Sequence, residues 1–242
     1  MASPIRRLIL WDIDGTLLTA GPVAREAFYA AAGEVLGRDL GDLRVQMSGK
    51  TDPLIALEIL ERAGVEPERA MGHLPSVLAA LERRLEAEGD RMRREGRTHP
   101  GIVELLERLG GQPGVVQSVL TGNLRANAEA KVRAFGLERF LDLAVGAYGS
   151  DHHDRERLVP IALERLRDHH EIPLPADAVW VVGDTPRDLA CARAGGAHCV
   201  LVATGRIPLD RLRGIGADAV LRDLSRTEEV VAILGLRGAS LR

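Results

Sequence analysis

The chain has 242 residues, with 45% hydrophobic and 28% charged side chains and a formal net charge of −3. This length suits one large domain or a core domain with a smaller inserted one, and the slightly acidic balance offers no basic field to nucleic acid. No apolar stretch approaches the roughly 18 residues of a membrane span, so we expect a cytoplasmic protein whose partners exclude nucleic acid and membrane.

The first predicted element is a short apolar strand at residues 8–11, and a block without any convincing strand follows it. From about residue 21 to about residue 97 the periodicity is helical, with helices expected at 23–36, 53–63 and 69–94. An all-helical block between the first two strands of a parallel sheet is best interpreted as an inserted cap domain. We expect the cap to span residues 19–97 and the core domain to comprise 1–18 and 98–242.

Beyond residue 98, short apolar runs alternate with amphipathic stretches, which is the pattern of a parallel sheet covered by helices. Strands are predicted at 115–120, 143–145, 179–182, 199–202 and 219–221, and helices at 101–109, 124–135, 158–169, 186–194 and 227–234. The expected fold class is therefore α/β, with a Rossmann-like parallel sheet core flanked by helices and a small all-helical cap. Ligands bind at the carboxyl ends of strands in such sheets, so residues there are candidates for a site.

An acidic motif, Asp-Ile-Asp-Gly-Thr at residues 12–16, comes directly after the first predicted strand. At the end of the strand the chain turns at Gly15, so Asp12 and Asp14 can both face the crevice. Two acids at the end of an apolar strand are costly unless a cation neutralises them. A single Asp at this place could be a helix N-cap, whereas the pair followed by Gly-Thr is much more specific.

A second acidic cluster, Asp184 and Asp188, follows the predicted strand at 179–182. Helix capping by Asp184 or Thr185 is the structural alternative, and both roles can hold together. Two acidic clusters at strand ends of one sheet indicate an oxygen-rich site for a hard cation. Carboxylates, a carbonyl, water and phosphate oxygens suit Mg²⁺ far better than Zn²⁺.

Thr121, Gly122 and Asn123 lie between another predicted strand and the helix that follows it. Free backbone N–H groups at a helix N-terminus bind phosphate, and a hydroxyl and an amide can add to that. Thr-Gly-Asn is also ordinary turn and cap chemistry, so the triplet alone is a weak signal. Together with the acidic motifs it marks candidate phosphate-binding residues.

With these three motifs the chain resembles the haloacid dehalogenase superfamily over nearly its whole length. The superfamily's Asp-x-Asp-Gly-Thr motif is matched by residues 12–16, its strand-end Thr or Ser by Thr121, and its Gly-Asp-x-x-x-Asp motif by residues 183–188. The helical insertion resembles the cap of the subgroup that contains phosphoglycolate phosphatase and β-phosphoglucomutase. The motifs are specific for fold and reaction and much less so for substrate.

The resemblance implies a Mg²⁺-dependent phosphatase that acts on a small phosphorylated metabolite, similar to phosphoglycolate or a sugar phosphate, through an aspartyl phosphate. Asp12 would be the nucleophile, Asp14 the general acid and base, and Thr121 a ligand of a phosphoryl oxygen. Asp12, the backbone carbonyl of Asp14, and Asp184 would bind Mg²⁺. Asp188 would be a ligand through water or a buttress.

The superfamily's third motif, a lysine shortly before a helix after the third strand, is missing from this chain. Arg155 aligns best if Pro160 takes the place of the proline that often follows that lysine, and Arg157 is the alternative. An arginine can screen the charges of Asp12 and a phosphate and stays ionised. We therefore expect Arg155 to take part in catalysis and phosphate binding.

One loop of the predicted cap, Met-Ser-Gly-Lys-Thr-Asp at 47–52, precedes a helix and could face the substrate. In related mutases and phosphatases a basic residue of the comparable loop contacts the substrate, so Lys50 is the first candidate, with Arg44 and Gln46 behind it. The structural alternative is a solvated Lys50 beside an N-cap formed by Thr51 or by Asp52.

Four other functions of the superfamily remain to be weighed. A dehalogenase and a phosphonate hydrolase both lack the second acid, so Asp14 argues against them. A phosphomutase of the β-phosphoglucomutase type uses the same acid pair and stays open. A non-catalytic phosphate-binding protein also stays open, because the third motif has exchanged Lys for Arg. Physiological substrate and oligomeric state are left undetermined.

Overall fold

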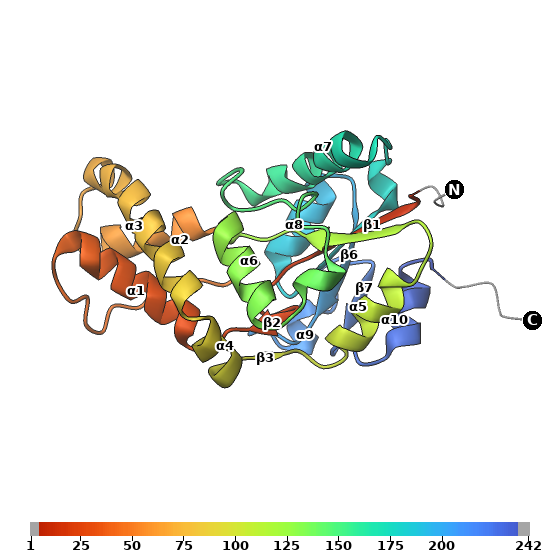
Figure 1. The fold of residues 1–242 in the computed structure, drawn as a ribbon, viewed down its shortest axis with the longest axis horizontal. Helices are drawn as coiled ribbons and strands as arrows, with labels where there is room; N and C mark the ends of the chain where they lie inside the picture. Colours follow the sequence, from red (N-terminus) through yellow and green to blue (C-terminus); the bar gives the residue numbers. More distant parts are fainter. Residues whose placement is uncertain (1–4, 237–242) are drawn as a thin grey trace, which may run out of the picture.

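A five-stranded parallel sheet forms the centre of the larger part of the molecule, which the computed structural model describes from residue 5 to residue 236 (Figure 1). Its strand order is β4-β1-β5-β6-β7. The strands are β1 (Arg7–Trp11), β4 (Val115–Val119), β5 (Val179–Gly183), β6 (His198–Val202) and β7 (Ala219–Leu221). The predicted fold class is confirmed. Residues 1–4 and 237–242 of the predicted core domain lie outside the described residues.

Helices cover both faces of this sheet, because its strands are apolar on both sides as buried parallel strands usually are. In β1, Leu8 belongs to one hydrophobic cluster and its neighbour Ile9 to another, and both side chains are fully buried. The first cluster includes α7 (Leu158–His170), α8 (Pro186–Ala194) and α9 (Leu209–Leu212), and the second includes α5 (Ile102–Gly110), α6 (Arg125–Ala134) and α10 (Thr227–Ile233). Among residues 5–236, no helix combines the length and apolarity needed to cross a membrane.

A block of four helices is inserted between β1 and β4 and extends away from the sheet (Figure 1). Its members are α1 (Val23–Leu36), α2 (Asp52–Arg62), α3 (Pro67–Ala87) and α4 (Gly89–Glu95). Buried side chains such as Phe28, Ile59 and Leu81 form its interior. The predicted all-helical insertion is confirmed, but the single helix expected at 69–94 is interrupted at Glu88, which separates α3 from α4.

A short antiparallel ribbon connects the helical block to the sheet. It consists of β2 (Leu18–Thr19) and β3 (Arg97–Thr98), with Leu18 opposite Thr98 and Thr19 opposite Arg97. The domain boundaries expected at 18/19 and 97/98 fall inside this ribbon. Two-residue strands are too short for a detectable period in the sequence, so the ribbon was not predicted.

The strand predicted at 143–145 is wrong, since these residues form turns. The Asp142 side chain accepts a hydrogen bond from the Ala144 N–H at 3.2 Å, and the Asp142 carbonyl accepts one from the Val145 N–H at 3.2 Å. These local bonds replace a ladder with β4. Just beyond this segment, Ala147 forms an isolated parallel bridge to Leu120. Val145 is nevertheless buried, which explains the apolar run.

Candidate active site

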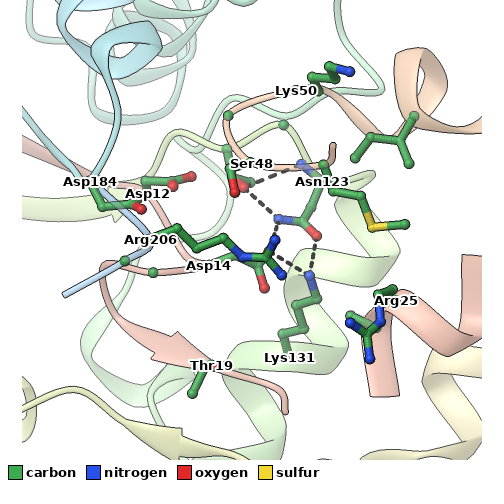
Figure 2. Close-up of a pocket in the computed structure, with 18 of the residues that line it drawn as sticks. Asp12, Asp14, Thr19, Arg25, Ser48, Lys50, Asn123, Lys131, Asp184 and Arg206 are labelled. Atoms are coloured by element: carbon green, nitrogen blue, oxygen red, sulfur yellow. Dashed lines mark hydrogen bonds and ion pairs between the residues drawn. The ribbon is translucent and has the colours of Figure 1, made fainter. Parts of the chain in front are cut away.

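A cavity of about 320 Å³ lies between the carboxyl ends of the strands and the helical block (Figure 2). The sheet side contributes Asp12, Asp14, Thr121, Gly122, Asn123, Lys131, Arg155 and Asp184, and the helical block contributes Arg25, Phe28, Met47, Ser48, Gly49, Lys50, Asp52 and Ile55. Almost every residue singled out in the sequence therefore lines one cavity. Asp188 is buried and does not line it, and neither do the alternatives Arg157, Arg44 and Gln46.

Three carboxylates from two strand ends meet at the floor of this cavity. One oxygen each of Asp12, Asp184 and Asp188 lies within 4.8 Å of the others, and all three residues are buried. Burial raises the pKa of Asp12 to about 7, with a lowering contribution from Arg155 and further raising contributions from Asp188 and Asp14. Burial, followed by the charges of Asp12 and Asp188, raises the pKa of Asp184 to about 8. Ionisation of these buried carboxylates therefore costs free energy when no cation is bound.

The donor set fits a hard divalent cation. The Oδ1 atom of Asp184 is buried and has no hydrogen-bond partner among the described residues, and such orphaned acceptors in native proteins call for an unseen ligand. Carboxylate oxygens are the ligands that Mg²⁺ prefers. Gly15 allows this crowding, because it adopts a left-handed φ of 91° and a Cβ there would lie 2.6 Å from Asp184 Oδ2.

Arg155 supplies the only basic side chain that contacts this cluster within residues 5–236. It begins a 3₁₀ turn, Arg155–Arg157, which starts where the Asp154 side chain accepts a hydrogen bond from the Glu156 N–H at 3.0 Å. The Arg155 Nη2 atom lies 2.9 Å from Asp12 Oδ1 and also contacts Asp188 Oδ1. Arg157 is exposed and does not line the cavity. The structure thus brings Arg155, and not Arg157, to the acids.

Asp188 has both of its oxygens engaged by protein groups. Besides Arg155 at Oδ1, its Oδ2 accepts hydrogen bonds from the Thr185 N–H at 2.9 Å and the Thr185 hydroxyl at 2.7 Å, which forms a capping box at the start of α8. Of the two roles expected for Asp188, this arrangement favours the buttress. Of the two capping residues weighed, Thr185 is the N-cap of α8, and Asp188 completes the capping box.

Asp14 stands apart from the acidic cluster. Its side chain is 44% exposed, and Oδ2 accepts hydrogen bonds from Asn123 Nδ2 at 2.9 Å and from Lys131 Nζ at 2.6 Å. Figure 2 shows Asn123 and Lys131 converging on this carboxylate. The two acids of the first motif therefore have different surroundings, which is a requirement for two different chemical roles.

The segment 121–124 is shaped by the helical block as well as by β4. A Cβ at Gly122 would clash with the backbone carbonyl of Lys50, so only glycine lets the two segments approach this closely. The Leu124 N–H, at the N-terminus of α6, donates to Asp52 Oδ2 at 2.9 Å. Part of the expected helix N-terminus is thus already occupied by a protein carboxylate.

Lys50 lines the cavity from the loop before α2, but its ammonium group is paired with the Glu58 carboxylate of that helix. Its side chain is 17% exposed, so the alternative of a fully solvated lysine does not hold. Arg44 and Gln46 do not line the cavity, and Arg44 lies beside Asp42 on the surface.

Sequence reasoning missed Lys131 and Asp52 as parts of the site. Lys131 is 3% exposed and Asp52 is 4% exposed, and both line the cavity. A signal for Lys131 was present, because the chain has 32 basic residues and only two of them, Lys50 and Lys131, are lysines. For Asp52 the position before a helix pointed to a cap, but its partner helix could not be inferred.

Comparison with known proteins gives a consistent picture. The family model described as haloacid dehalogenase-like hydrolase matches residues 9–193. A protein of Dickeya dadantii named "Probable phosphatase IndB" is 28% identical over 91% of each chain, and "Putative pyrophosphatase PpaX" of Caldanaerobacter subterraneus subsp. tengcongensis is 25% identical over 92% of this chain and 93% of its own. A crystal structure of a "predicted phosphatase" from Clostridium acetobutylicum aligns with a TM-score of 0.69 over 94% of this chain and 99% of that one, at 17% identity.

The fold and site define an α/β enzyme with strand-end carboxylates and a helical insertion, and the matched residues contain both acidic motifs. The chain belongs to the haloacid dehalogenase-like hydrolase family. The resemblance expected from the sequence is confirmed, and the likeness to solved structures confirms the fold.

Proposed function

We propose that this hydrolase is a Mg²⁺-dependent phosphatase that transfers phosphate from a small phosphorylated metabolite to Asp12 and then to water. One observation carries the proposal: the two acids of the first motif are held in separate environments. Asp12 lies in the buried acidic cluster with Arg155 at 2.9 Å, whereas Asp14 is half-exposed at the cavity with Lys131 at 2.6 Å. This difference supports a nucleophilic role for Asp12 and proton exchange by Asp14.

In the first step a carboxylate oxygen of Asp12 attacks phosphorus as the ester P–O bond breaks, and the leaving oxygen takes its proton from Asp14. In the second step Asp14 takes a proton from water, whose oxygen attacks the same phosphorus. The bond between Asp12 and phosphorus then breaks and inorganic phosphate leaves. The Thr121 hydroxyl would hold a phosphoryl oxygen, together with neighbouring N–H groups contributed by Gly122 and Asn123.

Asp12, the backbone carbonyl of Asp14, and Asp184 would hold Mg²⁺, with Asp188 as a buttress or a ligand through water. When bound, the ion supplies neutralisation of the negative charge that gathers on the phosphoryl group. Arg155 shares this task from the protein side, because its guanidinium stays ionised beside Asp12.

The substrate proposal rests on the cavity and on the named relatives. A cavity of about 320 Å³ suits a small metabolite such as phosphoglycolate or a sugar phosphate, and the name of one relative adds pyrophosphate to the compounds to be tested. Lys50 remains a proposed substrate contact, although it would have to leave or share Glu58 to serve as one.

The test is phosphate release from a panel of phosphorylated metabolites, with and without Mg²⁺, by the wild type and Asp12→Asn. We expect release that needs Mg²⁺ and that falls more than about 10³-fold in the variant, since a missing nucleophile removes the covalent route. Asp210→Asn, an exposed acid paired with Arg213, is the matched control and should behave as wild type. Substantial release by Asp12→Asn would rule out Asp12 as the nucleophile, and transfer to a second hydroxyl would identify a mutase.

A further inference from the structure

A chain of hydrogen bonds through Lys131 and Asn123 connects Asp14 with Thr121 (Figure 2). The Lys131 Nζ atom donates to Asp14 Oδ2 and to Asn123 Oδ1, each at 2.6 Å. Asn123 Nδ2 in turn donates to Asp14 Oδ2 at 2.9 Å and to Thr121 Oγ1 at 2.7 Å. One lysine thus contacts the proposed proton carrier directly and the proposed phosphate ligand through one amide.

The direction of these hydrogen bonds is fixed by the lysine. An ammonium group has three donors and no acceptor, so the oxygen of the Asn123 amide must face Lys131. The Asn123 nitrogen then faces Asp14 and Thr121, and the Thr121 oxygen accepts. Among residues 5–236, no acceptor receives the Thr121 hydroxyl proton. That proton is therefore free to be donated into the cavity.

Lys131 is far more buried than the other basic side chains of α6. It is 3% exposed, whereas Arg125 and Arg133 of the same helix have side chains about half exposed that pair with Glu129. A buried ammonium group is costly unless it is paired and hydrogen-bonded. Here its partners are Asp14 and Asn123, both at the cavity.

We propose that Lys131 is a positioning residue that holds Asp14 in place and, through the amide of Asn123, keeps the Thr121 hydroxyl as a donor toward the phosphoryl group. The inference rests on the proposed phosphatase function. Lys131 contacts no reacting atom in this role. Without it, the Asn123 amide oxygen loses its donor and Asp14 loses its charged partner, so the amide and the carboxylate are held only by the hydrogen bond between them.

The first experiment compares Lys131→Met with the wild type on two substrates that differ in their leaving group, an alkyl phosphate and p-nitrophenyl phosphate. Proton donation by a positioned acid contributes about 10²–10⁴-fold to a rate. We expect kcat for the alkyl phosphate to fall by at least about 10²-fold with a smaller change in KM, and kcat for p-nitrophenyl phosphate to fall less, because nitrophenolate leaves without a proton. Arg133→Met is the matched control on α6 and should leave both rates unchanged.

A double-mutant cycle then tests the chain through Asn123. If the two residues act as one unit, Lys131→Met combined with Asn123→Ala should lose little more than the worse single variant. Losses that multiply would contradict the proposal, and so would an unchanged kcat in Lys131→Met. If Lys131→Met does not fold, Lys131→Arg, which keeps the donor, should retain more activity than Asn123→Ala, and the reverse order would overturn the inference.

Phosphate release by the wild type distinguishes a failure of the Lys131 proposal from a failure of the proposed phosphatase function. Absence of Asp12-dependent phosphate release in the wild type would overturn the phosphatase proposal and this inference with it. Asp12-dependent release that is insensitive to Lys131→Met would overturn only the role of Lys131.

Discussion

Arg155, an always ionised side chain, contacts two acids of the cluster with a single nitrogen, and this geometry supports its proposed alignment with the third-motif lysine. Its alignment with the third motif was predicted from the sequence, with Arg157 as the alternative. The location of Lys131 was not predictable in the same way. It meets Asp14 across 117 residues of sequence, and no local spacing encodes such a contact.

Removal of the Arg155 cation should impair the site strongly. In Arg155→Met, the buried carboxylates of Asp12 and Asp188 lose their only basic partner within the described residues. We therefore expect kcat to fall by roughly 10²-fold or more, as for other lost electrostatic contacts to a transition state. Arg155→Lys should retain part of the activity. Steady-state phosphate release checks both, and Arg157→Met is the control. A comparable loss in Arg157→Met would restore the alternative alignment.

At the scale of elements, the start of α2 is joined to the start of α6 by Asp52. Its Oδ2 accepts hydrogen bonds from the Leu124 N–H and from Asn127 Nδ2 at 2.7 Å, and its own N–H donates to the Gly122 carbonyl at 2.7 Å. Asp52 therefore binds the N-terminal end of a helix other than its own, where the hydrogen bond from the Leu124 N–H offsets only part of the cost of burying a charged carboxylate. The sequence showed a capping residue, but which helix it serves depends on how the helical block lies on the sheet.

Asp52 should make the contact between the helical block and the sheet depend on pH. Burial raises its pKa to about 6, with Lys131 as the largest lowering contribution and Asp14 as a raising one. A raised pKa means that the form in which Asp52 is buried against α6 binds the proton more tightly than a form in which Asp52 is exposed to water. The contact is thus strongest at low pH and weakens as pH rises from about 4 to about 6, by up to roughly 3 kcal/mol.

Small-angle X-ray scattering at pH 5 and pH 8 checks this expectation. The radius of gyration of the wild type should increase at pH 8, whereas Asp52→Asn, which cannot ionise, should change less. Since Asp12 and Asp184 titrate in the same range, the difference between wild type and variant is the informative quantity. Equal changes in both proteins would assign the effect to other groups.

For the whole molecule, the alternation of apolar strands and amphipathic helices predicted the α/β class, the place of the helical insertion and the convergence of both acidic motifs. The same patterns failed where length or local bonds decided the outcome. The strands β2 and β3 are two residues long, which is too short to show an alternation of apolar and polar residues. The apolar run at 143–145 forms a buried turn, because the Asp142 side chain accepts a hydrogen bond from the Ala144 N–H. Patterns report burial and alternation, and they do not report hydrogen bonds made across the fold.

Mg²⁺ should stabilise the whole protein more at pH 8 than at pH 5.5. The raised pKa values of Asp12 and Asp184 mean that the metal-free fold loses stability as pH rises from about 4 to about 8, and that protons compete with the cation at the low end. At 100 times its dissociation constant a ligand adds about 2.7 kcal/mol, or roughly 5–10 °C in Tm for a chain of this size.

Thermal unfolding with and without Mg²⁺ at the two pH values measures this difference. Asp184→Asn should abolish most of the shift, and Asp210→Asn should keep it. An equal Mg²⁺ effect at both pH values, or one that survives Asp184→Asn, would place the ion elsewhere.

The antiparallel ribbon of β2 and β3 has a consequence for how such a chain can diversify. The segment that leaves the sheet at Thr19 returns beside it at Arg97, and paired strands lie only about 5 Å apart. Any length of polypeptide can therefore be spliced between these two residues at little cost in loop closure, while the register of the sheet stays as it is. The helical block over the cavity can therefore be replaced as one unit, while the strand ends that carry the acidic motifs stay unchanged.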